Sequence, residues 1–207
     1  LLYAVYINGL HEALRQAGLG LWVYGRLVPL LFYADDIVLL AANEADLAAS
    51  LRVVEAYALK WRFAVNHGKS NILVFGSRAV KVSAARTTWR LSGRTISVAR
   101  AYKYLGLDFD STAAGGSAGK WNAQLQRLLD SARKGMHLLL FQGGGPDGLC
   151  PQTMAHLWKT LGRPLLEYGC EIWHGEVSAQ LCKRLETVQN SFCRAILGLK
   201  SFPAASA

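Results

Sequence analysis

The stretch Leu30-Leu-Phe-Tyr-Ala-Asp-Asp-Ile-Val-Leu-Leu-Ala41 places two adjacent acids between two apolar runs that carry no other charge. Each run is short and rich in residues that favour β-structure, which predicts a strand, a tight turn and a second strand, with Asp35 and Asp36 at the turn. Side chains alternate between the faces of a strand, so neighbouring acids can point to one place only where the chain bends. The stretch therefore predicts a β-hairpin with an acid pair at its tip.

An acid pair between buried strands needs a partner, because two carboxylates that lose water also repel each other. A divalent cation offsets both the lost hydration and the repulsion between the carboxylates. Mg²⁺ suits this role, since it takes oxygen ligands, commonly one or two carboxylates together with substrate phosphates. The alternative is that Asp35 and Asp36 form an ordinary solvated turn, because Asp is frequent in hairpin turns.

The composition indicates a folded chain with a polyanionic partner. The 207 residues suffice for one large domain or two small ones, 52% of them are hydrophobic, and the formal net charge is +9. No acid lies between Glu55 and Asp108, whereas this window holds Lys60, Arg62, Lys69, Arg78, Lys81, Arg86, Arg90, Arg94, Arg100 and Lys103. Aromatic residues lie among these cations, a combination that suits backbone phosphates and stacked bases. The alternative is a solvated basic face over core aromatics.

Nothing in the sequence predicts secretion or a membrane span. The first ten residues lack the basic leader of a signal peptide, and charges interrupt the apolar region 19–42. The four cysteines form no Cys-x-x-Cys pair and suggest no disulfide framework. We therefore expect an intracellular protein of the nucleus or cytoplasm that is not secreted and has no membrane partner.

Hydrophobic periodicity predicts the elements on both sides of the acid pair. Residues 1–14 repeat as an amphipathic helix that ends near Gly18, and residues 19–25 form a short strand. After the acid pair, Asn43 is a natural N-cap for an amphipathic helix that reaches Trp61.

Two further segments precede a change in composition. Residues 63–75 predict a turn between two short strands, and residues 89–98 predict a hairpin through Ser92-Gly93. The Ser/Thr/Ala/Gly run 111–119 predicts a domain boundary.

The remainder of the chain reads as helical. Apolar residues repeat at helical spacing in 121–139, 154–172 and 181–196, and Pro164 is expected to bend the second helix. The apolar face of each helix must pack on another helix or on the preceding domain. A generic three-helix interaction bundle is the alternative for this region.

Tyr33-Ala-Asp-Asp36 between apolar strands resembles motif C of reverse transcriptases, and most closely the non-LTR (LINE-type) retrotransposon branch. Four other segments resemble parts of that branch in the same order: residues 1–10 the segment after motif B, residues 63–75 motif D, residues 102–107 the primer grip of motif E, and residues 164–173 the region where a helical thumb clamps the duplex.

The resemblance implies an α+β fold, with an antiparallel palm sheet and its covering helices followed by an α-helical thumb-like region. On this basis residues 1–110 are a partial palm with motifs C, D and E, and residues 117–199 are a helical thumb-like domain.

The chemistry implied by the resemblance is attack of a primer 3′-hydroxyl on a nucleotide α-phosphate, with Mg²⁺ (or Mn²⁺) ions stabilising the attacking and leaving oxygens. Asp35 would be the principal metal ligand and Asp36 the secondary one, with Tyr33 beside the primer end. Lys69 would protonate the pyrophosphate leaving group or stabilise its charge. An ordinary surface lysine at a turn is the alternative for Lys69.

The implied partners are an RNA template and a DNA primer, held as an RNA–DNA duplex, and deoxynucleotide triphosphates once the site is complete. Nucleic-acid contacts are expected from Tyr33, Arg62, Lys69, Arg78, Lys103, Tyr104 and Gly106.

One component of the implied site is missing. A two-metal site needs another carboxylate, which the family supplies from motif A, and the only acid before Asp35 is Glu12, in a predicted helix. The chain also starts without Met, so we expect a fragment of an RNA-directed DNA polymerase that does not polymerise alone. Two alternatives stay open: a non-catalytic nucleic-acid-binding remnant and a helical protein-interaction domain.

Overall fold

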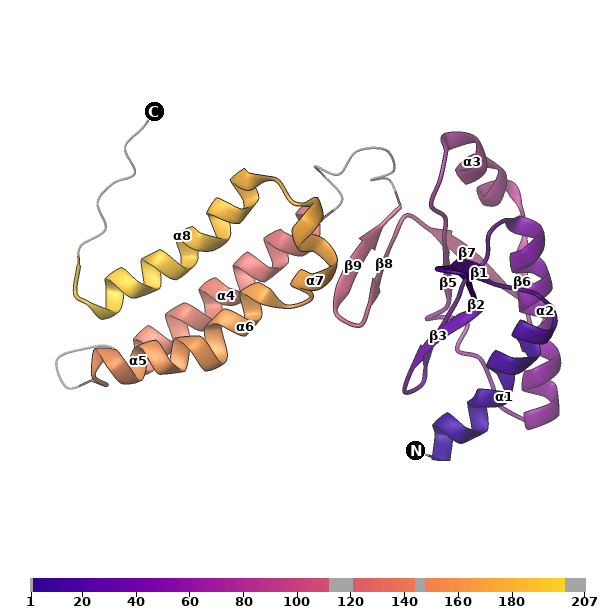
Figure 1. Cartoon of the computed structure of the whole chain (residues 1–207), viewed down its shortest axis with the longest axis horizontal. Helices are drawn as coiled ribbons and strands as arrows, with labels where there is room; N and C mark the ends of the chain where they lie inside the picture. Colours follow the sequence, from indigo (N-terminus) through magenta and orange to yellow (C-terminus); the bar gives the residue numbers. More distant parts are fainter. Residues whose placement is uncertain (1, 112–120, 144–147, 200–207) are drawn as a thin grey trace. The chain divides into compact units, whose positions relative to one another are not determined.

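A computed structural model describes residues 2–111, 121–143 and 148–199. The chain divides into two compact units, Leu1–Ala99 and Arg100–Ala207 (Figure 1). Both helices and strands are present, and this mixed structure is compatible with the predicted α+β class. None of the helices in the described ranges is long and apolar enough to cross a membrane.

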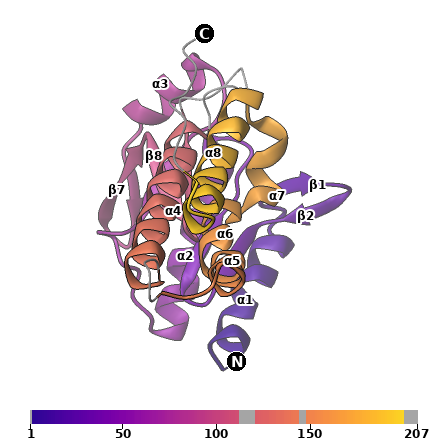
Figure 2. The same cartoon turned by 90° about the vertical axis from the view of Figure 1, so that its left-hand side faces the viewer.

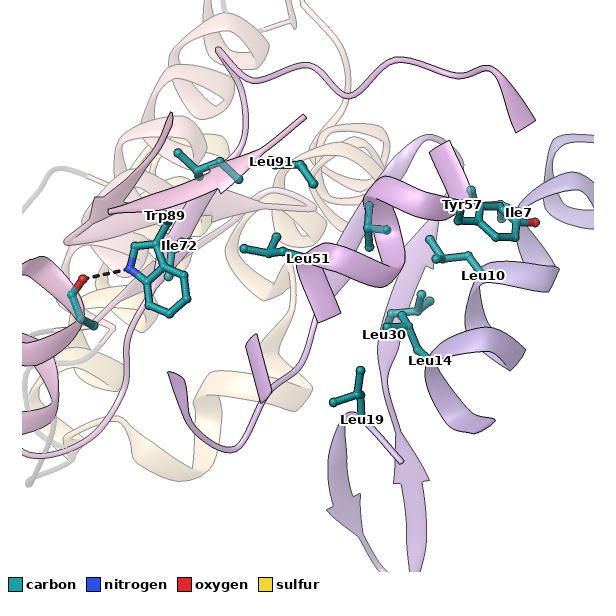
Figure 3. Close-up of a cluster of buried hydrophobic side chains, with 13 residues drawn as sticks. Ile7, Leu10, Leu14, Leu19, Leu30, Leu51, Tyr57, Ile72, Trp89 and Leu91 are labelled. Carbon is teal, nitrogen blue, oxygen red and sulfur yellow. Dashed lines mark hydrogen bonds between the residues drawn. The ribbon is translucent and has the colours of Figure 1, made fainter. Parts of the chain in front are cut away.

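The core of the first unit lies between two helices and the strands. Helix α1 (Leu2–Gln16) packs against α2 (Glu44–Trp61), and its stripe of Ile7, Leu10 and Leu14 is completely buried. Figure 3 shows this stripe beside Tyr57, whose hydroxyl donates a 2.7 Å hydrogen bond to the carbonyl of Tyr6. The predicted helix 1–14 is therefore confirmed.

Helix α2 begins at the predicted N-cap. The Asn43 side chain accepts a 2.9 Å hydrogen bond from the amide of Asp46, and its Nδ2 donates a 2.8 Å bond to the Asp46 carboxylate. These bonds satisfy an amide that the first helical turn leaves without a partner.

Asn43→Ala is expected to destabilise the first unit by about 1 kcal/mol, because the side chain that caps α2 is lost. Urea unfolding of the full chain, followed by amide exchange in α2, measures the loss. Asn190→Ala, at an exposed mid-helix position of α8 (Ala179–Ile196), is the control and should cost nothing. Equal losses in both variants would contradict the capping role.

The strands of the first unit form separate small sheets, not the single antiparallel sheet that the resemblance implied. There are two antiparallel pairs and one three-stranded sheet of order β5-β7-β6, in which β5 and β7 run parallel. The elements are β1 (Leu21–Val23), β2 (Arg26–Val28), β3 (Leu30–Tyr33), β4 (Asp36–Leu39), β5 (Asn71–Leu73), β6 (Trp89–Leu91) and β7 (Arg94–Ala99).

A helix that the sequence analysis missed lies between β5 and the other two strands of the three-stranded sheet. Helix α3 (Arg78–Arg86) begins after the N-cap Ser77 and separates β5 from the β6–β7 hairpin. Strand β6 runs antiparallel to β7 and so carries the chain back, which lets β7 lie beside β5 in the same direction. The indole of Trp89 donates a 2.9 Å hydrogen bond to Ala84 O, which ties α3 to β6 (Figure 3).

The prediction of two strands in residues 63–75 is wrong in its first half. Residues 63–66 have no regular structure, residues 67–69 form a turn, and only Asn71–Leu73 is a strand. The reason lies at the end of α2, where Arg62 adopts a left-handed conformation (φ 56°) and redirects the chain. The hairpin through Ser92-Gly93 is confirmed.

The second unit consists of a hairpin and several helices. Strands β8 (Ala101–Tyr104) and β9 (Leu107–Asp110) pair antiparallel, and α4 (Asn122–Gly143) and α8 lie side by side (Figures 1 and 2). The predicted first and third helices are thus confirmed. Between them lie α5 (Pro151–Leu157), a π-helical turn (Trp158–Gly162), α6 (Arg163–Glu167), α7 (Cys170–Trp173) and a 3₁₀ turn (His174–Glu176).

The predicted second helix is divided rather than simply bent. The π-helical turn Trp158–Gly162 ends just before Pro164, which has no amide hydrogen to donate into the helix. A second interruption follows at Tyr168-Gly169, where Gly169 has a φ of +69°. The sequence predicted the irregularity at Pro164 but not the one at Gly169.

The β8–β9 hairpin belongs to the second unit because it packs on α4. Leu107 is buried with Trp121, Leu125, Leu128 and Trp173. Except for Ser111, the predicted boundary in 111–119 lies outside the described residues, and the assignment of palm and thumb to 1–110 and 117–199 stays a prediction.

Candidate active site

The acid pair lies at the tip of the β3–β4 hairpin, as the sequence predicts. Tyr33 pairs with Asp36 in the antiparallel register, which leaves Ala34 and Asp35 as a two-residue turn. Ala34 has a φ of +51°, a left-handed conformation that costs a residue with a side chain some strain. Asp35 thus lies in the turn itself, and Asp36 is the first residue of β4.

The two faces of this hairpin differ. Leu30 is buried in the core of the first unit, and Ile37 and Leu39 pack against that core. Cross-strand partners share a face, so Tyr33 and Asp36 lie together on the opposite face. Tyr33 is 65% exposed, which leaves this face open to a ligand.

The acids are less enclosed than their apolar neighbours suggested. Asp35 and Asp36 are both exposed, and Leu31 and Phe32 of β3 are also exposed. The reason is that β3 and β4 pair only with each other among the described residues, so the tip has no flanking strand. The expectation that both carboxylates lie between buried strands is therefore wrong, and hydration stabilises the pair.

The donor set fits part of a divalent-metal site. Two adjacent carboxylates supply hard oxygen ligands of the kind that Mg²⁺ combines with water and phosphate oxygens. Within the described residues, however, there is no group of three or more His, Cys, Asp or Glu side chains that could hold a metal ion. Asp35 and Asp36 thus offer two ligands, and the remaining ligands must come from elsewhere.

Lys69 lies on a different turn from the carboxylates. It is exposed in the turn of residues 67–69, and its amide donates a 3.1 Å hydrogen bond to Asn66 O. The neighbouring His67 ring nitrogen Nε2 lies 2.8 Å from Leu91 O, which fixes this turn against β6.

Two of the predicted nucleic-acid contacts of the first unit lie at helix ends. Arg62 is the exposed C-cap of α2, and Arg78 is the exposed first residue of α3. Arg78 and Arg86 line an open depression of about 640 Å³ along α3. In the described ranges no ion pair is formed by Lys60, Arg62, Arg78, Arg86, Arg90, Arg94 or Lys103. These cations are therefore available to an external anion.

The remaining predicted residues lie on the β8–β9 hairpin. Tyr104 pairs with the buried Leu107 and shares its helix-facing side, whereas Lys103 pairs with Asp108 on the opposite side and is exposed. Leu105 (φ +46°) and Gly106 (φ +78°) form the two-residue turn. The segment Lys-Tyr-Leu-Gly therefore presents one cation outward and anchors its second tyrosine inward.

Sequence reasoning missed the side chains that hold this hairpin. Arg127 of α4 and Tyr168 at the end of α6 both form hydrogen bonds to the turn Leu105-Gly106. Tyr168 lies 63 residues from Leu105 in the chain. No local pattern signals a contact over such a separation.

Comparison with known proteins adds to this geometry. A family model described as "Reverse transcriptase (RNA-dependent DNA polymerase)" matches residues 1–109, which is more than half of the chain and includes the β3–β4 hairpin with its acid pair. Neither the comparison with curated proteins nor the comparison with solved structures gave a match. An exposed acid pair at a hairpin tip, inside a match of this extent, leads to one assignment: the chain belongs to the reverse transcriptase family.

Proposed function

We propose that this chain is the C-terminal palm and thumb portion of an RNA-directed DNA polymerase of the non-LTR (LINE-type) retrotransposon branch. The observation that carries the proposal is the exposed pair Asp35 and Asp36 at a two-residue turn within the family match. Its partner is an RNA–DNA duplex of template and primer, and its substrates are deoxynucleotide triphosphates. Such a partner implies an intracellular site of action, in the nucleus or cytoplasm.

Each part of the proposed site has a defined task. Asp35 and Asp36 would hold Mg²⁺ or Mn²⁺, which supplies charge neutralisation at the reacting phosphate and at the attacking and leaving oxygens. Tyr33 shares the exposed face of Asp36, and in this proposal it would lie beside the primer end. Lys69 offers a cation for the pyrophosphate leaving group. Lys103 would hold the primer, Tyr104 would support it from the inward side of the same hairpin, and the helices of the second unit would clamp the duplex.

The metal ligation is tested by Mn²⁺ titration of the full chain. Paramagnetic broadening of the amide signals of Ala34 and Ile37 is expected in the unmodified chain. It should be lost in Asp35→Asn/Asp36→Asn, because amides bind divalent cations much more weakly than carboxylates do. Asp130→Asn, an exposed acid on α4, is the control and should leave the broadening unchanged. Unchanged broadening in the double variant would contradict the assigned ligands.

The chain alone is expected not to extend a primer with Mg²⁺ or Mn²⁺. Two carboxylates are the only acids that its described residues bring to the hairpin tip, and a two-metal site needs more ligands than these. A primer-extension assay measures this. Synthesis by the unmodified chain that disappears in Asp35→Asn would show that the site is already complete.

Duplex binding is tested through its salt dependence. The combined variant Arg62→Ala/Arg78→Ala/Lys103→Ala should bind an RNA–DNA duplex at least tenfold more weakly at low salt, on the order of magnitude expected for lost phosphate contacts. The slope of log affinity against log salt should fall by about one for each contact removed. Fluorescence anisotropy over a salt series measures both quantities.

A matched control removes the same number of charges elsewhere. Arg15, Arg133 and Arg163 each form an ion pair with an acid of their own helix. Replacing these three by alanine should leave the salt slope unchanged. If both triple variants lose affinity equally, only the net charge matters, and the proposed contacts are wrong.

Among the described residues, no third His, Cys, Asp or Glu joins Asp35 and Asp36 to complete a metal site. This favours a second candidate, a non-catalytic protein that keeps the basic surface and binds nucleic acid without turnover. It predicts the same salt slope but no Mn²⁺ binding at the hairpin tip. A third possibility, a helical protein-interaction domain, predicts no salt-dependent duplex binding at all. The two titrations together therefore separate the three functions.

A further inference from the structure

The turn of the β8–β9 hairpin is held by a tyrosine from the helical part of the same unit. The hydroxyl of Tyr168 donates a 2.7 Å hydrogen bond to Leu105 O. Its ring lies directly over Gly106, where a Cβ would come within 2.9 Å of the ring carbon Cε1. Tyr168 is 50% exposed, so burial alone does not account for its place over the turn.

The hairpin in turn places a side chain against the α6–α7 connection. Gly169, next to Tyr168, leaves space for the side chain of Leu107, since a Cβ there would lie 2.6 Å from Leu107 Cδ2. The buried Trp173 donates a 2.9 Å hydrogen bond from its indole nitrogen to Tyr168 O, which fixes the backbone at this residue. The hairpin and the α6–α7 connection therefore pack closely through two glycines, at each of which a Cβ would force the neighbouring side chain to move.

A second side chain holds the turn from α4. Arg127 donates from Nη2 to Gly106 O and from Nε to the Asp108 carboxylate at 2.7 Å. The buried Gln124 accepts both from Arg127 and from the amide of Asp108, the latter at 3.1 Å. The carbonyls of both turn residues thus accept hydrogen bonds from side chains outside the hairpin.

We propose that Tyr168 and Arg127 are positioning residues, which set the orientation of the Leu105-Gly106 turn so that the Lys103 side of the hairpin receives the 3′ end of a primer. A two-stranded hairpin is marginal by itself, and its tip is the part least restrained by strand pairing. Two hydrogen bonds to the turn carbonyls restrain this tip, while the Lys103 face stays open. The inference rests on the proposed function, because it assigns the primer end to this hairpin.

The test compares two tyrosines in the full chain. Tyr168→Phe removes the hydroxyl bond to Leu105 O but keeps the ring over Gly106. Tyr57→Phe removes an equally short hydroxyl bond, 2.7 Å to Tyr6 O, in the first unit. The probes are two RNA–DNA duplexes of equal length, one with a recessed primer 3′ end and one continuous. The ratio of their dissociation constants measures recognition of the end.

The unmodified chain is expected to bind the recessed duplex more tightly than the continuous one. Tyr168→Phe should reduce this preference about threefold to tenfold, the effect of one hydrogen bond. Binding to the continuous duplex and amide protection in α4 should not change. Tyr57→Phe should keep the full preference. A Tyr168→Phe variant with normal preference, or a Tyr57→Phe variant that loses it, would overturn the positioning role.

An independent pair of variants tests the arginine. Arg127→Lys keeps the charge but cannot reproduce the planar fork that contacts both Gly106 O and Asp108, so the preference should again fall. Arg133→Lys, whose partner is Asp130 on the same helix, is the control and should not change it. If the unmodified chain shows no preference for a recessed end, the primer-holding function itself is wrong. If the preference exists but survives either substitution, the positioning role of that residue is wrong, and the primer-holding function stands.

Discussion

Gly106→Ala is expected to destabilise the second unit by about 2–3 kcal/mol, from strain and from a lost contact. A left-handed backbone costs an L-residue about 1–2 kcal/mol, and Gly106 has a φ of +78°. The new Cβ would also lie 2.9 Å from the Tyr168 ring, so the ring must move. This movement breaks the hydroxyl bond to Leu105 O, which contributes about 1 kcal/mol. Amide exchange of α4 and β9 in the full chain measures the loss.

Gly93→Ala separates these two contributions. Gly93 occupies the same second position of a two-residue turn, with a φ of +74°, but a Cβ there meets nothing within 4 Å. The substitution should therefore cost only the strain of about 1–2 kcal/mol. Losses of equal size at Gly93 and Gly106 would show that Tyr168 does not restrain the turn.

Phe192→Ala is expected to cost the second unit about 3–5 kcal/mol, the range for truncating a buried aromatic side chain. Phe192 is completely buried and stacks on Trp158, with ring centroids 4.6 Å apart. Its removal leaves a cavity among Leu129, Ala132 and Met154. Thermal unfolding followed by tryptophan fluorescence measures the loss, because Trp158 lies beside the new cavity.

Phe141→Ala is the matched control for this truncation. Phe141 lies on α4 in the same unit but is 88% exposed, so little packing is lost with its ring. The expected change is within about 0.5 kcal/mol, as for an ordinary surface substitution. A loss at Phe192 no greater than that at Phe141 would contradict the assigned core.

The elements of this fold were predictable where a local pattern determines them. Asn43 caps α2 because its side chain reaches an amide three residues on, and such a signal is complete within four residues of sequence. The hairpin through Ser92-Gly93 is equally local, since two residues define its turn. The acid hairpin belongs to this class, and so the sequence placed Asp35 at the turn.

Other features depend on contacts that no local pattern records. Helix α3 has an N-cap at Ser77 and apolar residues at Val80 and Ala84, a signal too short to distinguish a helix from a loop. The exposure of Asp35 and Asp36 depends on which strands flank β3 and β4, and apolar neighbours do not reveal this. The bond from Tyr168 to Leu105 joins residues 63 apart in the chain.

The backbone at the acid tip differs from that of the other two-residue turns in a way that affects its chemistry. At Tyr24-Gly25, Ser92-Gly93 and Leu105-Gly106 both turn residues have positive φ, and glycine takes the second position. At the acid tip only Ala34 is left-handed, and Asp35 keeps an ordinary φ. Position 35 therefore carries no left-handed strain that would favour glycine, so Asp35→His or Asp35→Cys could replace the carboxylate by an imidazole or a thiol, and either change tests the proposed preference of the hairpin tip for a hard cation.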